Sequence, residues 1–489
     1  MGNIFRISEK DNVAVALCDL KKGSHEGKIT LHDNIPFGHK VSLCDIKNGD
    51  KIIKYGNLIG YATEDILAGS HVHTHNIKTA LSENVTYSFS GNNKYNFKES
   101  NITFQGYERA NGGVGVRNDL WIITTVGCVN KTAEKLGEIA KKIMPNECTG
   151  VKVITHPYGC SQMGDDLVNT QKVLASLVKH PNAGAVLVVS LGCENNNIEE
   201  FKKVLKSYDE NRVRFLVTQN VPNEIDEGKK IIEKLFSYIS AFNRKNVPFS
   251  KLKIGLKCGG SDAFSGITAN PLCGRMTDLF TDFGASVILT ETPEMFGAEQ
   301  ILMSRAKNEA VFNKIVNMIN DYKSYFIRYG QTIYENPSPG NKAGGITTLD
   351  EKSLGCVQKG GEAVITDVLG YAEHCEKAGL NLLWGPGNDI VSTTNLVATG
   401  AQIILFTTGR GTPLGSVVPT VKISSNTELF KKKTDWIDFN AGELLDGANF
   451  EDVSNKLFNL ILDIASGKTA KNEINEYSGI AIFKDGVTM

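Results

Sequence analysis

Residues 120–128 read Leu-Trp-Ile-Ile-Thr-Thr-Val-Gly-Cys, an apolar run that ends in glycine and cysteine. A short run of this kind predicts a strand buried on both faces. The amphipathic stretch 131–144 follows it and predicts a helix. Strands that alternate with helices predict an α/β fold with a parallel sheet and crossover helices. The alternation continues with predicted strands at 151–155, 185–190, 212–218 and 252–256 and predicted helices at 167–179, 198–207 and 224–241.

The sequence on either side of this region predicts further folded units. Residues 1–81 carry short apolar runs separated by glycines and predict a small β domain. Residues 82–100 are polar, rich in asparagine and without apolar periodicity, which predicts a linker. We assign 101–270 to an α/β domain with cysteines at its strand ends, and 271–489 to a C-terminal α/β domain.

The composition argues against several classes of partner. The 489 residues include 53 Lys and Arg against 54 Asp and Glu, a formal net charge of -1. That balance gives no overall field for a polyanion, so we expect neither nucleic acid nor a membrane as a partner. No apolar run approaches the roughly 20 residues that span a bilayer. The first 20 residues carry acids through their apolar stretch, unlike a signal peptide, and we therefore expect a cytoplasmic protein.

Four of the ten cysteines follow predicted strands. Cys128, Cys160 and Cys193 each follow a glycine and lie 32 and 33 residues apart, about one strand-helix unit, and Cys258 follows 65 residues later. Ligands of open parallel sheets bind at the carboxyl ends of the strands. The spacing therefore predicts that the four thiols converge as ligands for iron or zinc, or that three of them hold a labile iron–sulfur cluster. The alternative is that each cysteine is a small packed residue at a crowded strand end.

Histidines are concentrated in the stretch 69–76, where three of the nine alternate along the chain. On an extended strand, alternating residues share one face, and imidazole is a common metal ligand and acid–base group. We therefore take His73 and His75 as candidate metal ligands or catalytic groups, the alternative being a solvated polar edge. His156 lies four residues before Cys160 and is either a further acid–base group or a structural residue.

Four glycine-rich turns, at 111–115, 258–262, 336–345 and 407–412, have backbone N–H groups that could bind an anion. None matches the fingerprint of a dinucleotide or nucleoside-triphosphate site. The last two contain a cation among glycines and hydroxyls, which suits a carboxylate, although each cation could equally be an ordinary surface charge. The predicted substrate contacts in these turns are Ser261, Asp262, Asn341, Lys342 and Arg410.

Motifs spread over nearly the whole chain carry a resemblance to a known family. They lie at 71–76, 109–118, 125–130, 158–162, 191–196, 258–262, 291–299, 336–345 and 408–413. Together they resemble the altronate and galactarate dehydratase family of sugar-acid hydro-lyases. The variants at 111–113, 160–162 and 194–196 are more similar to the altronate than to the galactarate branch.

The resemblance implies a fold and an activity. The N-terminal β domain would be a SAF domain of the β-clip type, on a larger catalytic body. The enzyme would convert D-altronate to 2-dehydro-3-deoxy-D-gluconate and water in hexuronate catabolism. It would depend on Fe²⁺, with Mn²⁺ as a substitute, and would act as a homo-oligomer.

The candidate residues suit this chemistry. Removal of the proton next to a carboxylate builds charge on that carboxylate, which a divalent cation and fixed donors stabilise. A base takes the C2 proton and an acid assists loss of the C3 hydroxyl. Other readings remain: a related lyase that acts on galactarate, sulfolactate or another 2-hydroxy acid, or a sugar-acid-binding protein without turnover. Binding alone needs no thiol or histidine clusters, which favours an enzyme. The unranked acid–base candidates are His73, His75, His156 and Lys342.

Overall fold

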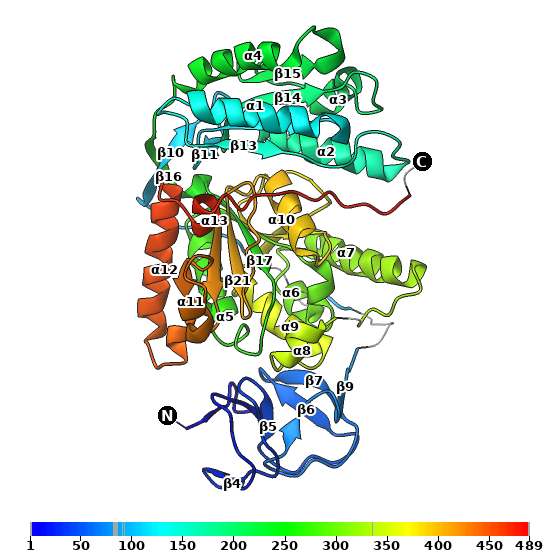
Figure 1. The fold of residues 1–489 in the computed structure, drawn as a ribbon. Helices are drawn as coiled ribbons and strands as arrows, with labels where there is room; N and C mark the ends of the chain where they lie inside the picture. The colour runs from blue at the N-terminus through cyan, green and yellow to red at the C-terminus, as the bar shows by residue number, and fades with distance from the viewer. Residues whose placement is uncertain (1, 82–86, 90, 92, 335, 488–489) are drawn as a thin grey trace.

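The computed structural model describes residues 2–81, 87–89, 91, 93–334 and 336–487, which form three units (Figure 1). A small β unit is followed by an α/β unit with a four-stranded sheet and by a larger one with a seven-stranded sheet. The larger α/β unit lies between the other two (Figure 1). The predicted fold class, a small N-terminal β domain followed by parallel sheets with crossover helices, is confirmed.

Short antiparallel strands build the N-terminal unit, in sheets of the order β1-β2-β5-β8, β6-β7-β9 and β3-β4. Its core is formed by small and β-branched residues, such as Ala14, Ala16 and Val41, which fit between closely spaced sheets. The strands are β1 (Ile4–Phe5), β2 (Val13–Ala16), β3 (His25–Glu26), β4 (Ile29–Thr30), β5 (Lys40–Ser42), β6 (Lys51–Lys54), β7 (Asn57–Ala62), β8 (His71–Val72) and β9 (Ile77–Lys78).

The second unit contains a parallel sheet in the order β13-β12-β14-β15. Helices α1 and α4 cover one face, and α2 and α3 cover the other, where the apolar core continues into the third unit. Its elements are β12 (Asp119–Thr124), α1 (Asn130–Ile143), β13 (Val151–Ile154), α2 (Asp165–Lys179), β14 (Ala183–Ser190), α3 (Ile198–Leu205), β15 (Val213–Val217) and α4 (Glu224–Ile239). A small antiparallel sheet lies beside it, formed by β10 (Thr103–Glu108), β11 (Val114–Gly115) and β16 (Lys245–Pro248).

The third unit contains a parallel sheet in the order β19-β20-β18-β17-β21-β22-β23. Its strands are β17 (Lys253–Cys258), β18 (Ser286–Leu289), β19 (Ile365–Leu369), β20 (Gly379–Leu383), β21 (Ile403–Thr408), β22 (Thr420–Ser424) and β23 (Phe439–Asn440). Its helices are α5 (Ala269–Asp282), α6 (Glu299–Met303), α7 (Glu309–Arg328), α8 (Pro339–Ala343), α9 (Leu349–Cys356), α10 (Asp389–Ala398), α11 (Thr427–Lys432), α12 (Phe450–Ala465) and α13 (Lys471–Ile474).

The division between the two α/β units differs from the predicted one at residue 270. Strand β17 pairs with β18 and β21, so it belongs to the seven-stranded sheet. The change of unit therefore falls between the end of α4 at Ile239 and the start of β17 at Lys253. The predicted boundary placed the strand at 252–256 in the preceding sheet. Strand-helix spacing gives the order of the strands, but it does not give the sheet that each strand joins.

Residues 82–86, 90 and 92 of the predicted linker lie outside the described residues. The described part has no helix or strand before β10 and runs along the third unit. There Tyr87 Oη donates to Glu299 Oε1 at 2.6 Å, and Tyr95 Oη donates to the Thr281 carbonyl at 2.9 Å. Within the part of the chain that the structure describes, no helix is long and apolar enough to cross a membrane.

Candidate active site

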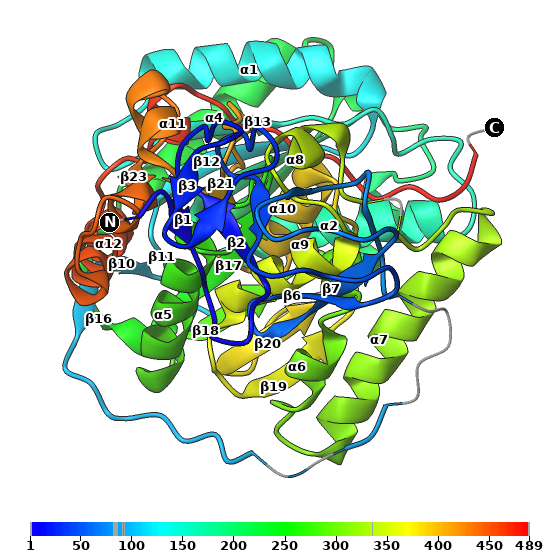
Figure 2. The same cartoon turned by 90° about the horizontal axis from the view of Figure 1, so that it is seen from below.

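A buried ion cluster fixes the N-terminal unit to the third unit. Glu351 on α9 accepts hydrogen bonds from Lys40 Nζ on β5 at 2.9 Å and from Lys54 Nζ on β6 at 2.7 Å. All three side chains are buried. Burial opposes the charge on Glu351, but the two ammonium groups hold its pKa well below its usual range. The β unit is thereby held over α8 and α9 (Figure 2).

Histidines of the β unit gather against the turn that contains α8. The rings of His39 and His73 stack at 4.7 Å, and His39 Nδ1 lies 3.0 Å from His71 Nε2. The Nε2–H groups of His73 and His39 face the carbonyl oxygens of Lys342 at 2.9 Å and Ala343 at 3.3 Å, which fixes both as donors. These rings therefore support the turn from the side of the β unit.

The predicted candidates His73 and His75 have different surroundings. His73 is half-buried, and burial lowers its pKa to about 4, so the ring is neutral near pH 7. His75 is exposed, and its ring lies 5.4 Å from that of His71. His73 thus reaches the third unit through the Lys342 carbonyl, whereas His75 remains at the surface.

A cavity of about 280 Å³ opens beside the same turn, between the β unit and the carboxyl ends of β17, β21 and β22. Phe37 contributes from the β unit, and the third unit contributes the cations Arg410 and Lys432 and the acids Asp262 and Glu428. A cavity that combines cations with hydrogen-bonding groups suits a small hydroxylated anion. Two of the predicted substrate contacts, Asp262 and Arg410, therefore line one cavity.

Asp262 is a buried carboxylate that its neighbours hold in place. It accepts hydrogen bonds from Ser425 Oγ at 2.8 Å, Ser265 N–H at 2.9 Å and Asn426 Nδ2 at 3.1 Å. Burial raises its pKa above the ordinary value. A Cβ atom at Gly409 would come within 2.1 Å of the Asp262 carboxyl carbon. Only glycine therefore allows the segment at residue 409 to approach Asp262 this closely.

The other predicted substrate contacts, Ser261, Asn341 and Lys342, lie next to the cavity and do not line it. Asn341 Nδ2 donates to the Ser261 carbonyl at 2.8 Å, and its Oδ1 accepts from Ser338 N–H at 3.1 Å. Ser261 and Asn341 are buried, so they tie α8 to the turn after β17. Lys342 is half-buried, and its carbonyl accepts from His73.

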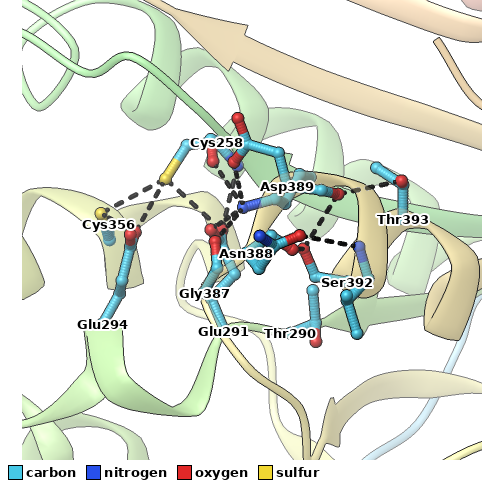
Figure 3. Close-up of polar contacts among 12 residues, drawn as sticks. Cys258, Thr290, Glu291, Glu294, Cys356, Gly387, Asn388, Asp389, Ser392 and Thr393 are labelled. Carbon is cyan, nitrogen blue, oxygen red and sulfur yellow. Dashed lines mark hydrogen bonds and ion pairs between the residues drawn. The ribbon is translucent and has the colours of Figure 1, made fainter. Parts of the chain in front are cut away.

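A second group of side chains lies just before this turn, at the end of β17 (Figure 3). Cys258 Sγ lies 3.5 Å from Cys356 Sγ, and each sulfur lies 3.1 Å from Glu294 Oε2. The three residues are buried. Among the described residues, they form the one set of three histidine, cysteine or acidic ligand atoms that all lie within 4.8 Å of one another.

Lysines surround this group. Lys352 Nζ donates to Glu294 Oε1 at 2.7 Å, and Lys257 Nζ donates to Glu291 Oε1. Lys257 also forms an ion pair with Asp389 at 3.0 Å. The side chain of Asp389 is 38% exposed and connects the group to solvent. The thiol of Cys356, together with nearby lysines, lowers the pKa of Cys258 to about 6, whereas burial raises that of Glu291.

The cysteines predicted to converge occupy two separate places. Cys128, Cys160 and Cys193 follow β12, β13 and β14, which are neighbours in the four-stranded sheet, and all three are exposed. Cys258 ends β17 in the seven-stranded sheet and is buried. The four thiols therefore do not share one sheet edge.

His156 is buried, and both of its ring nitrogens are paired. Nε2–H donates to the Thr124 carbonyl at 2.9 Å, and Nδ1 accepts from Tyr158 N–H at 3.1 Å. Burial lowers its pKa to about 4. This environment fits the structural alternative, because neither nitrogen is free to exchange a proton with a substrate.

Cys356, Glu294 and Lys257 lie in the site, although the sequence did not predict them as site residues. Glu294 lay within a recognised motif without an assigned role. Cys356 ends the sequence Leu-Gly-Cys at 354–356, which repeats Leu-Gly-Cys at 191–193. That repeat is a usable signal, but Cys356 ends a helix rather than a strand, so the spacing of strand ends does not predict it.

Comparisons with known proteins agree with this arrangement. Residues 2–80 match the altronate/galactarate dehydratase SAF domain, 106–240 the D-galactarate dehydratase/altronate hydrolase second domain, and 249–488 the D-galactarate/altronate dehydratase C-terminal domain.

Curated relatives match from end to end. The altronate dehydratase of Bacillus subtilis (strain 168) is 49% identical over 503 residues, 100% of each chain, and that of Escherichia coli (strain K12) is 49% identical over 492 residues, 99% of each chain. The galactarate dehydratase (L-threo-forming) of Escherichia coli (strain K12) is 34% identical over 520 residues, 98% of this chain and 96% of its own. With its three domains and its full length matched, this chain belongs to the D-galactarate/altronate dehydratase family.

Proposed function

We propose that this protein is a hydro-lyase that removes water from D-altronate to give 2-dehydro-3-deoxy-D-gluconate. The observation that carries the proposal is the 49% identity along the whole chain to two altronate dehydratases, against 34% to the galactarate dehydratase. A galactarate lyase and a binding protein without turnover are both less favoured by this likeness.

The cavity supports an acidic sugar as the substrate. Arg410 and Lys432 supply positive charge for a carboxylate. Asp262 accepts hydrogen bonds on both carboxylate oxygens from its neighbours, so its orientation is fixed before a substrate arrives. Fixed groups of this kind contribute to the rate because they need no rearrangement during the reaction.

The proposal includes a dependence on Fe²⁺, with Mn²⁺ as a substitute. Such an ion, when bound, would stabilise the negative charge that develops on the substrate carboxylate as the C2 proton leaves. The thiols and carboxylate at the end of β17 fit the ion, since two sulfurs and one carboxylate oxygen already converge there. An iron–sulfur cluster on Cys128, Cys160 and Cys193 is the competing arrangement, because these thiols are exposed at one sheet edge.

The remaining parts of the proposal concern the cell. We propose a cytoplasmic enzyme of hexuronate catabolism that acts on a small-molecule substrate, as a homo-oligomer, without nucleic acid or membrane as a partner. The balanced charge of the chain supports the absence of a nucleic-acid or membrane partner, because it provides no overall attraction to a polyanion.

An anaerobic substrate panel tests the activity. Protein purified without oxygen and supplied with Fe²⁺ is incubated with D-altronate, galactarate, sulfolactate and other 2-hydroxy acids, and the 2-keto acid product is measured. We expect the highest kcat/KM with D-altronate and loss of activity after chelation. A higher kcat/KM with galactarate, or full activity of metal-free protein, would contradict the proposal.

A further inference from the structure

We infer that Cys258, Glu294 and Cys356 form a mononuclear site for a thiophilic divalent metal, which is Fe²⁺ in the proposed function. The inference rests on the proposed function for the identity of the ion and deepens it by placing the ion in the chain. The three donors come from different elements: the end of β17, the segment after β18 and the end of α9.

The donor atoms already have nearly the spacing of a metal site. Metal–sulfur bonds of about 2.3 Å in a tetrahedral site place two sulfurs about 3.8 Å apart. Here the two sulfurs are 3.5 Å apart, and each lies 3.1 Å from the same Glu294 oxygen. Binding would therefore move the donors apart by only a few tenths of an ångström.

Neighbouring side chains hold the donors in this orientation. Lys352 Nζ binds Glu294 Oε1 at 2.7 Å and so directs the other oxygen, Oε2, at the sulfurs. Lys352 also donates to Asn336 Oδ1 at 2.9 Å, which fixes the ammonium group. Hydrogen bonds to the remaining atoms of a ligand are a regular feature of metal sites, because they fix the ligand before the ion arrives.

Ordinary packing does not account for two thiols in this environment. Buried cysteines usually behave as small apolar residues with a weak donor. Two others in this chain do so: Cys148 and Cys375 contact the carbonyl oxygens of Gly150 at 3.2 Å and Lys377 at 3.7 Å. By contrast, Cys258 and Cys356 contact each other and a shared carboxylate, so three possible metal donors face one another.

The donor set indicates which metals fit. Two thiolates select Fe²⁺ or Zn²⁺ over Mg²⁺, Ca²⁺ and Mn²⁺, which prefer oxygen ligands. Three protein ligands are one fewer than the four of a closed structural zinc site. Fe²⁺ should therefore bind more tightly than Mn²⁺ at these residues.

Metal binding can be measured without the reaction. The full-length protein is purified anaerobically, stripped with a chelator and titrated with Fe²⁺, Mn²⁺ and, as a spectroscopic probe, Co²⁺. We expect one Co²⁺ per chain, with near-ultraviolet charge-transfer absorption from two thiolates, and Mn²⁺ affinity at least tenfold below that of Fe²⁺.

Matched variants locate the ion. Cys258→Ser, Cys356→Ser and Glu294→Gln should each weaken Fe²⁺ and Co²⁺ binding at least tenfold, and each cysteine variant should lose about half of the thiolate absorption. Cys375→Ser makes the same change at a buried cysteine outside the site and should retain both signals. Circular dichroism melting of each variant shows whether it folds. If one of the three site variants fails to fold, the other two provide the test.

Two outcomes would overturn the inference. In the first, folded Cys258→Ser and Cys356→Ser bind Co²⁺ as the wild type does, while a triple serine variant of Cys128, Cys160 and Cys193 loses the metal. In the second, the wild type binds no metal in a one-to-one ratio. Stoichiometric binding that depends on Cys258 and Cys356, without turnover of D-altronate, would refute the proposed function and leave this site in place.

Discussion

Arg410 is an exposed cation beside a buried anion. It follows β21 in a turn that approaches Asp262 closely because residue 409 is glycine. The backbone N–H of Arg410 donates to the Gly260 carbonyl at 2.9 Å, so the start of the side chain is fixed at the edge of the cavity that Arg410 lines. Such a side chain can form two parallel hydrogen bonds with a carboxylate.

Replacement of Arg410 by alanine should weaken substrate binding. A charge-assisted hydrogen bond contributes about 1.5–3 kcal/mol, which corresponds to a rise in KM of roughly 10- to 150-fold. Steady-state kinetics with D-altronate measure this, and kcat should change less than KM. Arg410→Lys keeps the charge without the two-pronged geometry and should recover part of the affinity. An unchanged KM for Arg410→Ala would remove this residue from the substrate site.

At the scale of single elements, α9 connects the β unit with the proposed metal-binding residues. Its first turn carries Glu351, which binds Lys40 and Lys54 of the β unit, and its last residue is Cys356. The helix lacks an exposed face: all eight of its residues are buried. A disturbance at Glu351 should therefore be transmitted along α9 toward Cys356.

Glu351→Gln should destabilise the protein by about 3–5 kcal/mol, because it leaves two buried ammonium groups without a carboxylate. Urea unfolding measures the free energy of unfolding. Glu134→Gln provides a matched control, since Glu134 pairs with Lys131 at 2.6 Å on the exposed face of α1. An exposed pair contributes about 0–1 kcal/mol. Equal losses in the two variants would show that burial of the Glu351 cluster is unimportant for stability.

The whole molecule should be sensitive to acid because two histidines in the second unit are buried in neutral form. His180 resembles His156: its Nε2–H donates to the Ala401 carbonyl at 3.1 Å, and Nδ1 accepts from Asn182 N–H at 3.1 Å. Burial lowers the pKa of His180 to about 3 and that of His156 to about 4. The unfolded chain takes up these protons near pH 6.5, but the folded protein does not.

Stability should therefore be full above about pH 6.5 and should fall as the pH drops from 6.5 toward 4, by about 3 kcal/mol for each of the two groups at the lower end. Melting temperatures measured at pH 7, 6, 5 and 4.5 test this. His156→Gln removes one titrating group and should flatten the curve, whereas His32→Gln, at an exposed position, should not. A melting temperature that stays constant over this range would contradict the expectation.

The three units also differ in how far they depend on each other. Helices α2 and α10 pack together, and one apolar core includes Trp121 of the four-stranded sheet and Ile404 of the seven-stranded sheet. The C-terminal segment closes the same side, where the backbone N–H of Asp485 donates to Asp166 on α2 at 2.8 Å (Figure 1). The two α/β units are thus joined by a shared core, whereas the β unit is held through buried ions and histidines.

The sequence by itself determined the alternation of strands and helices, the β character of residues 1–81 and the turn that contains Asp262. These features depend on contacts between near neighbours, which the order of apolar, polar and glycine residues encodes directly. The sequence also predicted Asp262 and Arg410 as substrate contacts, but it placed them in different domains. They line one cavity because β17 pairs with β21, so the ends of both strands lie at one edge of the same sheet.

Only the tertiary structure decided how the cysteines are grouped. Cys258 and Cys356 are 98 residues apart and meet through the packing of α9 against the third unit, while Cys128, Cys160 and Cys193 remain on another sheet. Strand-helix spacing repeats in the same way within one sheet and across the change to the next, so it contains no record of the sheet that a strand joins. That choice depends on long-range pairing, such as that of β17 with β21, whose partners are about 150 residues apart in the chain.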